Sequence, residues 1–279
     1  MIISHTVKDI QELISSLKKL NKTISFVPTM GALHQGHMSL VDLANKAADI
    51  SVVSIFVNPT QFNEKSDLDK YPRTVKKDCE MLKNNQCDIV FIPSVEEIYH
   101  GDIACQADYG TLSETLEGAK RPGHFDGVVT VVKRLFEIVK PNIAYFGEKD
   151  FQQLAIIREM TSRHDFEITI EGAPIIREKT GLAMSSRNRL LSSQEVEIAL
   201  NLSKTLRWCV ENRYNKSIKN LLKEATLKLQ AIDGLRLEYL QIVDSDSFIS
   251  IDNFVLGEKS RVLIAAYVGN IRLIDNVAI

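Results

Sequence analysis

The sequence predicts an α/β protein in which helices cover both faces of a parallel sheet, followed by a smaller α+β domain. Up to about Gly172, short apolar runs alternate with longer amphipathic stretches, as in repeated strand–helix units. From about Ile175 the pattern changes to two long helical stretches followed by strand-like runs. With 279 residues the chain exceeds one typical domain, so we expect domains over 1–175 and 176–279.

Strands of the first domain are expected where the apolar runs are short, at 24–27, 50–57, 89–92, 143–146 and 166–170. The amphipathic stretches at 38–48, 74–84, 128–139 and 151–162 are expected to be its helices. In the second domain, Ser192 and Glu195 form a capping-box pattern that starts a helix ending near Asn212. A second helix at about 218–232 precedes strands at 237–243, 261–268 and 271–274.

Composition excludes several classes of protein. The 34 Lys and Arg nearly balance the 36 Asp and Glu, which is not the basic footprint of a general nucleic-acid binder. No apolar run approaches the ~20 residues of a membrane span, and the N-terminus lacks the pattern of a secretory signal. The four cysteines are scattered without zinc spacing, which indicates reduced thiols in a cytosolic protein.

The most informative segment is Thr29-Met30-Gly31-Ala32-Leu33-His34-Gln35-Gly36-His37, between an expected strand and an expected helix. Two histidines three residues apart share the first turn of that helix, where free backbone N–H groups attract phosphate. The glycines Gly31 and Gly36 would let a nucleotide approach the backbone closely. Zinc is the rival ligand for a His-x-x-His pair, but no carboxylate or cysteine nearby completes a tetrahedral set.

Two more polar turns follow expected strands, so three turns should converge on one edge of the sheet. The first is Asn58-Pro59-Thr60-Gln61-Phe62, and the second is Gly147-Glu148-Lys149-Asp150. On this edge Lys149 becomes a phosphate clamp, and Asp150 a contact to ribose or to metal-bound water. Alone, either turn would be interpreted as an ordinary solvated loop.

Further candidates lie near the domain junction and at a helix start. Met184-Ser185-Ser186-Arg187 joins two hydroxyls to a guanidinium that suits phosphate, although it could simply be a solvated turn. Gln61 and Gln153 are neutral amides that can orient a carboxylate nucleophile without pairing away its charge. His124 has two interpretations, one as a pocket-lining residue and one as a loop residue.

Four blocks together resemble the pantothenate synthetase (pantoate–β-alanine ligase) family over essentially the whole chain, from Val27 to the closing Arg272-Leu273-Ile274-Asp275-Asn276. A His-x-Gly-His motif alone would mark only the wider nucleotidyltransferase superfamily. The four blocks in the family's order are more specific, and they cover residues 28–37, 56–62, 146–154 and 181–188.

The resemblance implies a Rossmann-like N-terminal domain that binds ATP and pantoate. Because an acyl adenylate hydrolyses easily, we expect the small C-terminal domain and the 177–188 loop to form a lid that excludes water. The resemblance also implies transfer of AMP to pantoate, then displacement of AMP by β-alanine, in a cytoplasmic homodimer. His37 would be the proton donor, beside His34 and Lys149. Gln61 and Gln153 would bind pantoate, with Gln61 also near β-alanine, and Mg²⁺ would bridge the ATP phosphates, with Asp78 a weak protein ligand. The implied ATP contacts are Met30, Gly31, Ala32, Leu33, His34, Gln35, Gly36, His37, Gly147, Glu148, Lys149, Asp150, Ile176, Met184, Ser185, Ser186 and Arg187.

Two other functions fit parts of the pattern. A nucleotidyltransferase that keeps its nucleotidyl product would share the histidine motif, but it has no need of the two glutamine amides. A nucleotide-binding module without turnover would need no histidine pair at the point of phosphate transfer.

Overall fold

The computed structural model describes residues 1–62, 68–69, 71–99, 105–255, 257 and 259–279. Contacts divide the chain into two compact units, the first comprising Met1–Glu148 and Gln152–Pro174. The second comprises Lys149–Phe151 and Ile175–Ile279. The observed boundary lies one residue before the expected one, and Lys149–Phe151, expected in the N-terminal domain, groups with the second unit instead.

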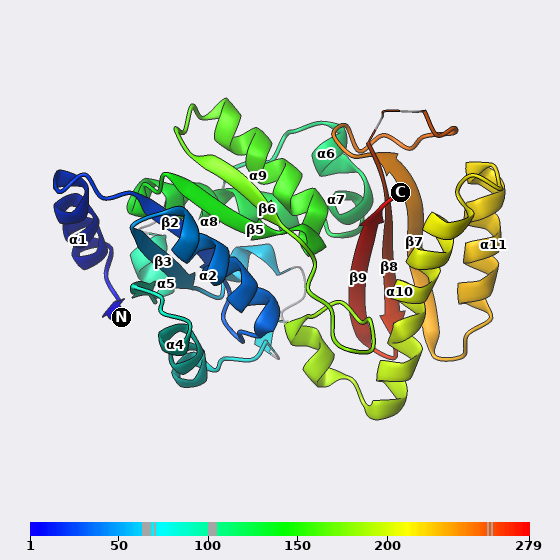
Figure 1. Ribbon diagram of the computed structural model, residues 1–279, viewed down its shortest axis with the longest axis horizontal. Helices are drawn as coiled ribbons and strands as arrows, with labels where there is room; N and C mark the ends of the chain where they lie inside the picture. Colours follow the sequence, from blue (N-terminus) through cyan, green and yellow to red (C-terminus); the bar gives the residue numbers. More distant parts are fainter. Residues whose placement is uncertain (63–67, 70, 100–104, 256, 258) are drawn as a thin grey trace. The chain divides into compact units, whose positions relative to one another are not determined.

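A parallel sheet organises the first unit, with the strand order β1-β4-β3-β2-β5-β6 among the described residues (Figure 1). This confirms the predicted fold class. In sheet order the strands are β1 (Ile2–Ser4), β4 (Ile89–Phe91), β3 (Ile50–Ile55), β2 (Ile24–Thr29), β5 (Ile143–Gly147) and β6 (Thr169–Ala173).

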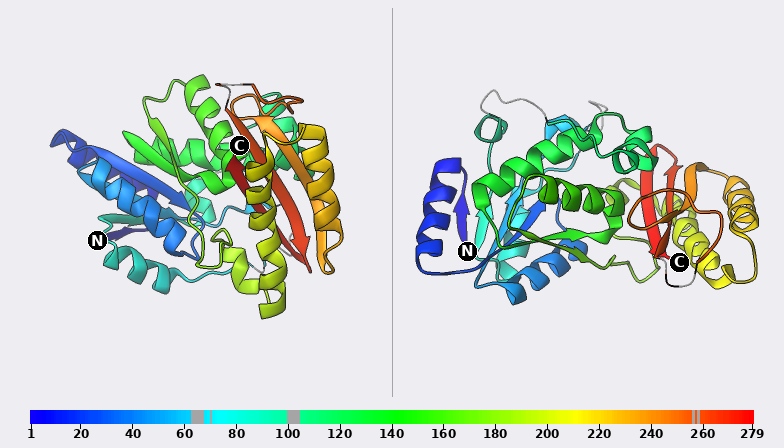
Figure 2. Two further views of the ribbon diagram at one scale, coloured as in Figure 1. Left: turned by 45° about the vertical axis from the view of Figure 1, so that its right-hand side comes forward. Right: turned by 90° about the horizontal axis from the view of Figure 1, so that it is seen from above.

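Helices cover both faces of this sheet (Figure 2), so most residues of the central strands β2 and β3 are buried, including the serines Ser25, Ser51 and Ser54. Consecutive residues of β2 enter different cores: Phe26 packs in one cluster and Val27 in another. The Phe26 cluster includes residues of α1 (Val7–Lys19), α8 (His124–Val139) and α9 (Phe151–Arg163). The Val27 cluster includes residues of α2 (Gln35–Ala47) and α4 (Val75–Asn84).

Short helical segments connect these elements. They are η1 (Pro59–Gln61), α5 (Val95–Ile98), α6 (Thr111–Glu114), α7 (Leu116–Lys120) and η2 (Glu148–Asp150).

Besides shifts of a few residues at other boundaries, the first unit differs from the sequence prediction in its last strand and in its N-terminal elements. The last strand begins at Thr169 rather than Phe166, because Asp165 takes a left-handed φ of 50° and the Phe166 ring packs against Phe136 with centroids 5.8 Å apart. The strand β1 and the helix α1 were not predicted. A three-residue strand gives too short a pattern, and β1 is fixed by pairing with distant β4.

In the second unit, an antiparallel sheet of β7 (Leu235–Asp244), β8 (Ser260–Val268) and β9 (Ile271–Ala278) packs against α10 (Ser193–Asn212) and α11 (Ile218–Gln230) (Figure 1). The capping box predicted at the start of α10 is confirmed: Ser192 Oγ accepts from Glu195 N, and Glu195 Oε2 accepts from Ser192 N. A 3-10 helix, η3 (Ser186–Leu190), precedes α10.

Within the described ranges, no helix combines the length and the apolar character needed to cross a membrane. All four cysteines are free, and Cys87 and Cys209 are buried.

Candidate active site

Three polar turns meet at the carboxyl edge of the parallel sheet. Because β2 pairs in parallel with both β3 and β5, the ends of these three strands lie side by side. The histidine loop follows β2, η1 follows β3, and η2 follows β5. The strand pairing confirms the predicted convergence. From β2, the chain adds strands β3 and β4 on one side and strands β5 and β6 on the other, so the strand order reverses between β2 and β5. Open α/β sheets bind their ligands at such a switch point.

The two histidines form the first turn of α2. His34 is its N-cap and His37 lies three residues later, with their ring centroids 4.0 Å apart. His34 Nδ1 accepts from Gly36 N at 3.1 Å, and His37 Nδ1 accepts from His34 N at 3.2 Å. A neutral imidazole that accepts at Nδ1 carries its proton on Nε2. Each ring is therefore a hydrogen-bond donor through Nε2, next to the N–H groups of a helix start.

The turn that precedes α2 contains two residues with a left-handed backbone conformation. Gly31 has a φ of +79° and Ala32 a φ of +51°, a conformation that L side chains rarely adopt. A Cβ on Gly31 would lie 3.0 Å from Ile55 Cγ2 and 3.2 Å from Asp78 Oδ2, so a side chain there would be both crowded and strained by the positive φ.

The buried carboxylate of Asp78 holds this turn in place. Its two oxygens accept from Ala32 N at 2.9 Å and Leu33 N at 2.8 Å, and Thr74 Oγ1 donates to it at 3.0 Å. Asp78 is 1% exposed. With both oxygens engaged by the protein and shielded from solvent, Asp78 is a poor ligand for Mg²⁺. The weak expectation of a metal role for Asp78 is therefore replaced by a role in shaping the histidine loop.

The amide of Gln61 is buried beside the histidine loop. Gln61 Nε2 lies 2.7 Å from Met30 Sδ, and its Oε1 accepts from Asn58 Nδ2 at 3.3 Å. The backbone of Gln61 is tied to the end of α7 and the start of α8. His124 Nδ1 of α8 lies 2.8 Å from its carbonyl oxygen, and Arg121 Nη2, at the end of α7, donates to the same oxygen at 3.4 Å. His124 is the first residue of α8 and is 6% exposed, so it is not the loop residue of one interpretation, and its ring supports the backbone of Gln61.

Gly127 permits this close packing of η1 on α8. A Cβ at Gly127 would lie 2.6 Å from the carbonyl carbon and oxygen of Thr60 and 2.7 Å from Gln61 N. Asn58 Nδ2 also donates to the Gly127 carbonyl at 3.0 Å. Sequence reasoning missed this support for Gln61, although Gly123-His124 and Gly127 in one short segment could have signalled a close backbone contact.

Asn58 is in turn held by Tyr99, whose hydroxyl donates to Asn58 Oδ1 at 2.7 Å. Burial raises the pKa of Tyr99, so its hydroxyl keeps the proton that this bond requires. Asn58 Oδ1 also accepts from Thr60 Oγ1 at 3.0 Å. The turn that presents Gln61 is therefore fixed by side chains from two other segments.

Two neighbouring glutamines open α9, and the structure separates their roles. Gln152 is 2% exposed; its amide accepts from Glu117 N at 3.0 Å and donates to the carbonyls of Leu112 and Thr115. Gln153 is half-buried and directed about 100° away from Gln152 around the helix. These contacts assign Gln152 to packing, which leaves Gln153 as the candidate for substrate.

The remaining predicted residues are divided between the units. Gly147 ends β5 and Glu148 begins η2 in the first unit. Lys149 and Asp150 belong to the second unit, where Lys149 Nζ lies 3.9 Å from Asp150 Oδ2. The Lys149 side chain is 19% exposed and that of Asp150 is 50% exposed.

The 177–188 segment in the second unit is more ordered than the loop expected there. Arg177 and Ala183 form an antiparallel bridge, and Met184 N donates to Ile176 O at 2.9 Å, which brings two of the predicted nucleotide contacts together. Ser185 caps η3 by accepting from Arg187 N at 3.3 Å, and Ser186 is buried.

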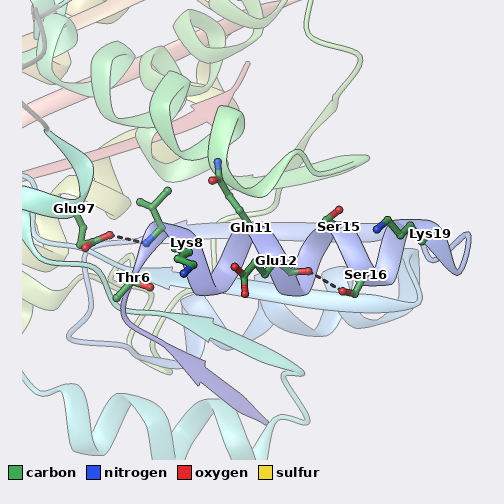
Figure 3. A pocket seen from close by; sticks show the side chains of 9 residues that line it. Thr6, Lys8, Gln11, Glu12, Ser15, Ser16, Lys19 and Glu97 are labelled. Atoms are coloured by element: carbon green, nitrogen blue, oxygen red, sulfur yellow. Dashed lines mark hydrogen bonds between the residues drawn. The ribbon is translucent and has the colours of Figure 1, made fainter.

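A separate cavity of about 830 Å³ lies along α1 and contains none of these residues (Figure 3). Its lining is polar and of mixed charge, including Lys8, Glu12 and Glu97. Glu97 Oε2 accepts from Val7 N at 2.6 Å and so caps the start of α1.

In the part of the chain that the structure describes, no group of three His, Cys, Asp or Glu side chains could hold a metal ion. Mg²⁺ binds proteins through few carboxylates when substrate phosphates and water supply its other ligands. The half-exposed carboxylate of Asp150 fits that mode, whereas Asp78 does not.

The sequence matches one protein family and several of its members over nearly its whole length. A family model described as pantoate-beta-alanine ligase matches residues 2–278. A pantothenate synthetase from Bacteroides fragilis is 48% identical over 279 residues, covering 99% of this chain and 98% of that protein. One from Porphyromonas gingivalis is 45% identical over 277 residues, covering 99% of each.

Two solved structures from the same family are similar to this chain over nearly its whole length. The crystal structure of pantothenate synthetase from Thermus thermophilus has a TM-score of 0.93 and 38% identity, covering 99% of both chains. A pantoate-beta-alanine ligase from Francisella tularensis, complexed with beta-gamma ATP and beta-alanine, has a TM-score of 0.83 and 36% identity, covering 99% of this chain and 97% of that one.

A doubly covered parallel sheet with a histidine pair at its switch point defines a nucleotide-binding α/β enzyme. The match over nearly every residue then fixes its family. The chain belongs to the pantoate–β-alanine ligase family.

Proposed function

We infer that this chain condenses pantoate with β-alanine to form pantothenate, with ATP converted to AMP and pyrophosphate. Family membership over residues 2–278 carries this conclusion. The histidine pair at the helix start of α2 supplies the feature that adenylation requires, because donors placed there can stabilise phosphate charge.

The reaction needs two steps because a carboxylate is a poor electrophile. First, a carboxylate oxygen of pantoate attacks the α-phosphorus of ATP, and the bond from that phosphorus to the bridging oxygen breaks to release pyrophosphate. Next, the amine of β-alanine attacks the carbonyl carbon of pantoyl adenylate. The amine attacks as the neutral NH2 form, the bond from this carbon to the phosphate oxygen breaks, AMP leaves with the electron pair, and the nitrogen loses one proton to solvent to become an amide.

In this scheme His34 and His37 donate through Nε2 to the phosphates, and His37 is the proton donor that the resemblance implies. Their Nδ1 atoms are occupied by backbone N–H groups, which supports this orientation. Lys149, Ser185, Ser186 and Arg187 would complete the set of donors from the second unit. The turns at 30–37 and 147–150, with Ile176 and Met184, would surround the rest of ATP.

Gln61 and Gln153 would orient pantoate, with Gln61 also near β-alanine. The buried position of Gln61 and the rigid support of η1 favour this role. A neutral amide holds a carboxylate by hydrogen bonds without the ion pair that would weaken its attack.

Magnesium is expected with the nucleotide, and Asp150 would hold it through water. When bound, Mg²⁺ neutralises charge on the phosphates of ATP. The other residues assigned to ATP keep their roles whether or not Asp150 holds Mg²⁺.

Closure of the C-terminal domain and the 177–188 segment would protect the adenylate from hydrolysis. Identical domain positions in structures with and without ATP would contradict that closure. We also expect a cytoplasmic homodimer, in keeping with the resemblance. Sedimentation equilibrium giving the mass of a single chain would exclude the dimer.

Pantoate-dependent exchange of labelled pyrophosphate into ATP, measured without β-alanine, tests the function. We expect exchange only with pantoate, and AMP release with amide formation once β-alanine is added. A nucleotidyltransferase that keeps its product would never consume the amine. A binding module would bind ATP without exchange, and either result would overturn the proposed function.

A further inference from the structure

Asp275 and Asn276 are adjacent polar residues on β9, 4% and 2% exposed, in the closing motif at residues 272–276. The proposed chemistry gives this motif no part. Both residues pair with β8, opposite Ile264 and Leu263, so the sheet fixes their backbone. Consecutive strand residues project to opposite faces, which lets one strand hold two different segments.

Asn276 holds the segment that carries Lys149. Its Nδ2 donates to the Lys149 carbonyl at 2.9 Å, and Arg261 Nη1 donates to its Oδ1. Because Arg261 can only donate, Asn276 must turn its oxygen to Arg261 and its amide nitrogen to Lys149.

The same arginine secures the other end of this segment. The guanidinium carbon of Arg261 lies 3.7 Å from the ring centroid of Phe151, which stacks on Phe248 with centroids 5.5 Å apart. These contacts explain why Lys149–Phe151 groups with the second unit while the residues on either side belong to the first.

Asp275 holds the start of the 177–188 segment. Its carboxylate accepts two bonds from Arg177, at 2.6 and 2.9 Å, the bidentate geometry that fixes a guanidinium most firmly. Arg177 Nη1 also donates to Gly181 O at 3.2 Å, and the Arg177–Ala183 bridge closes the turn. Farther along, β9 contacts η3, which contains Ser186 and Arg187.

We propose that Asp275 and Asn276 are positioning residues for the nucleotide: through Asn276 the strand β9 sets Lys149, and through Asp275 it sets the segment bearing Ser185, Ser186 and Arg187. The C-terminal unit then carries both parts of the phosphate clamp as one piece instead of only covering a site built elsewhere. This inference rests on the proposed function, because it assigns the clamp to ATP phosphates.

The test is the variant Asn276→Asp in the full-length chain. It keeps the shape of the side chain and the acceptor for Arg261, but it replaces the donor to Lys149 with an oxygen that repels the carbonyl. In the pyrophosphate exchange assay we expect the KM for ATP to rise about tenfold and the KM for pantoate to change less than about twofold. Equal increases in both KM values would overturn the assignment to the nucleotide.

A double-mutant cycle with Lys149→Ala shows whether Asn276 acts through the lysine. ATP affinity, measured by calorimetry, should fall when Asn276→Asp is made in the native chain, and should change little when it is made in Lys149→Ala. An equal loss in both backgrounds would contradict the proposal. If Asn276→Asp does not fold, Asn276→Ser, which also loses the reach to Lys149, is measured in the same cycle.

The matched control is Glu238→Gln. It weakens the ion pair between Glu238 of β7 and Arg272 of β9, the strand that carries Asn276, and it touches neither clamp segment. It should leave the KM for ATP unchanged. Deuterium uptake of a peptide spanning residues 146–151 should rise in Asn276→Asp and not in Glu238→Gln. If the native chain shows no pantoate-dependent exchange, the proposed function is refuted. The role of Asn276 is then still decided by the measurements of ATP affinity and deuterium uptake.

Discussion

At the residue scale, the histidine pair shows how one side chain can serve both structure and chemistry. In each ring Nδ1 accepts a backbone N–H, so the fold itself selects the tautomer with a proton on Nε2. The sequence motif could predict two histidines on the first turn, because spacing along a helix is local. It could not predict the tautomer, which depends on how the cap forms.

Two amide variants of His37 separate these roles. Asparagine can place its oxygen near the position of Nδ1, whereas glutamine can place its nitrogen near that of Nε2. We expect His37→Asn to keep its thermal stability but lose about 10²–10³-fold in exchange rate. His37→Gln should lose about 1 kcal/mol of stability through the weaker cap yet remain the more active of the two. The opposite ranking of activities would refute the assigned tautomer.

Asp78 is a second case in which a residue was predicted and its role was not. The resemblance implied Asp78 as a weak ligand of Mg²⁺, but the bonds of its carboxylate to Ala32 and Leu33 cross more than 40 positions in sequence. No local rule connects such residues. The left-handed conformation of Gly31 and Ala32 explains why the histidine loop needs this support.

At the element scale, strands and helices with strong local patterns were predictable. The parallel strands β2 and β3 are short, mostly buried segments rich in apolar residues, and α10 begins at a capping box. The start of β6 was predicted three residues early, because the ring of Phe166 packs in the core without belonging to a strand. The packing of η1 on α8 was not predictable, since it joins segments about 60 residues apart.

Gly127→Ala tests that packing directly. The added methyl group would meet the backbone of Thr60 at 2.6 Å, so η1 must move and carry Gln61 with it. We expect the free energy of unfolding to fall by about 1–3 kcal/mol. Relative to the native chain, the KM for pantoate should rise more than the KM for ATP. Glu137→Ala, at a half-exposed position on the same helix, is the control and should change neither KM. An unchanged pantoate KM in Gly127→Ala would show that η1 does not position Gln61.

At the scale of the whole molecule, the sequence predicted a change of architecture near residue 175, and the contacts place it between Pro174 and Ile175. It placed Lys149 in the N-terminal domain, because a residue is normally assigned with its neighbours along the chain. Contacts with Asn276 and Arg261, more than 100 residues later, assign the Lys149 segment to the second unit instead. Of the residues predicted to donate to phosphate, His34 and His37 therefore lie in the first unit and Lys149 lies in the second.

The central claim is that these donors serve a reaction at the α-phosphorus of ATP, and pantoate labelled with ¹⁸O in its carboxylate tests it most directly. After one turnover with ATP and β-alanine, mass spectrometry should find one ¹⁸O atom in AMP, one in the amide carbonyl of pantothenate and none in pyrophosphate. Label in pyrophosphate or inorganic phosphate would mean attack at another phosphorus, and would contradict the account.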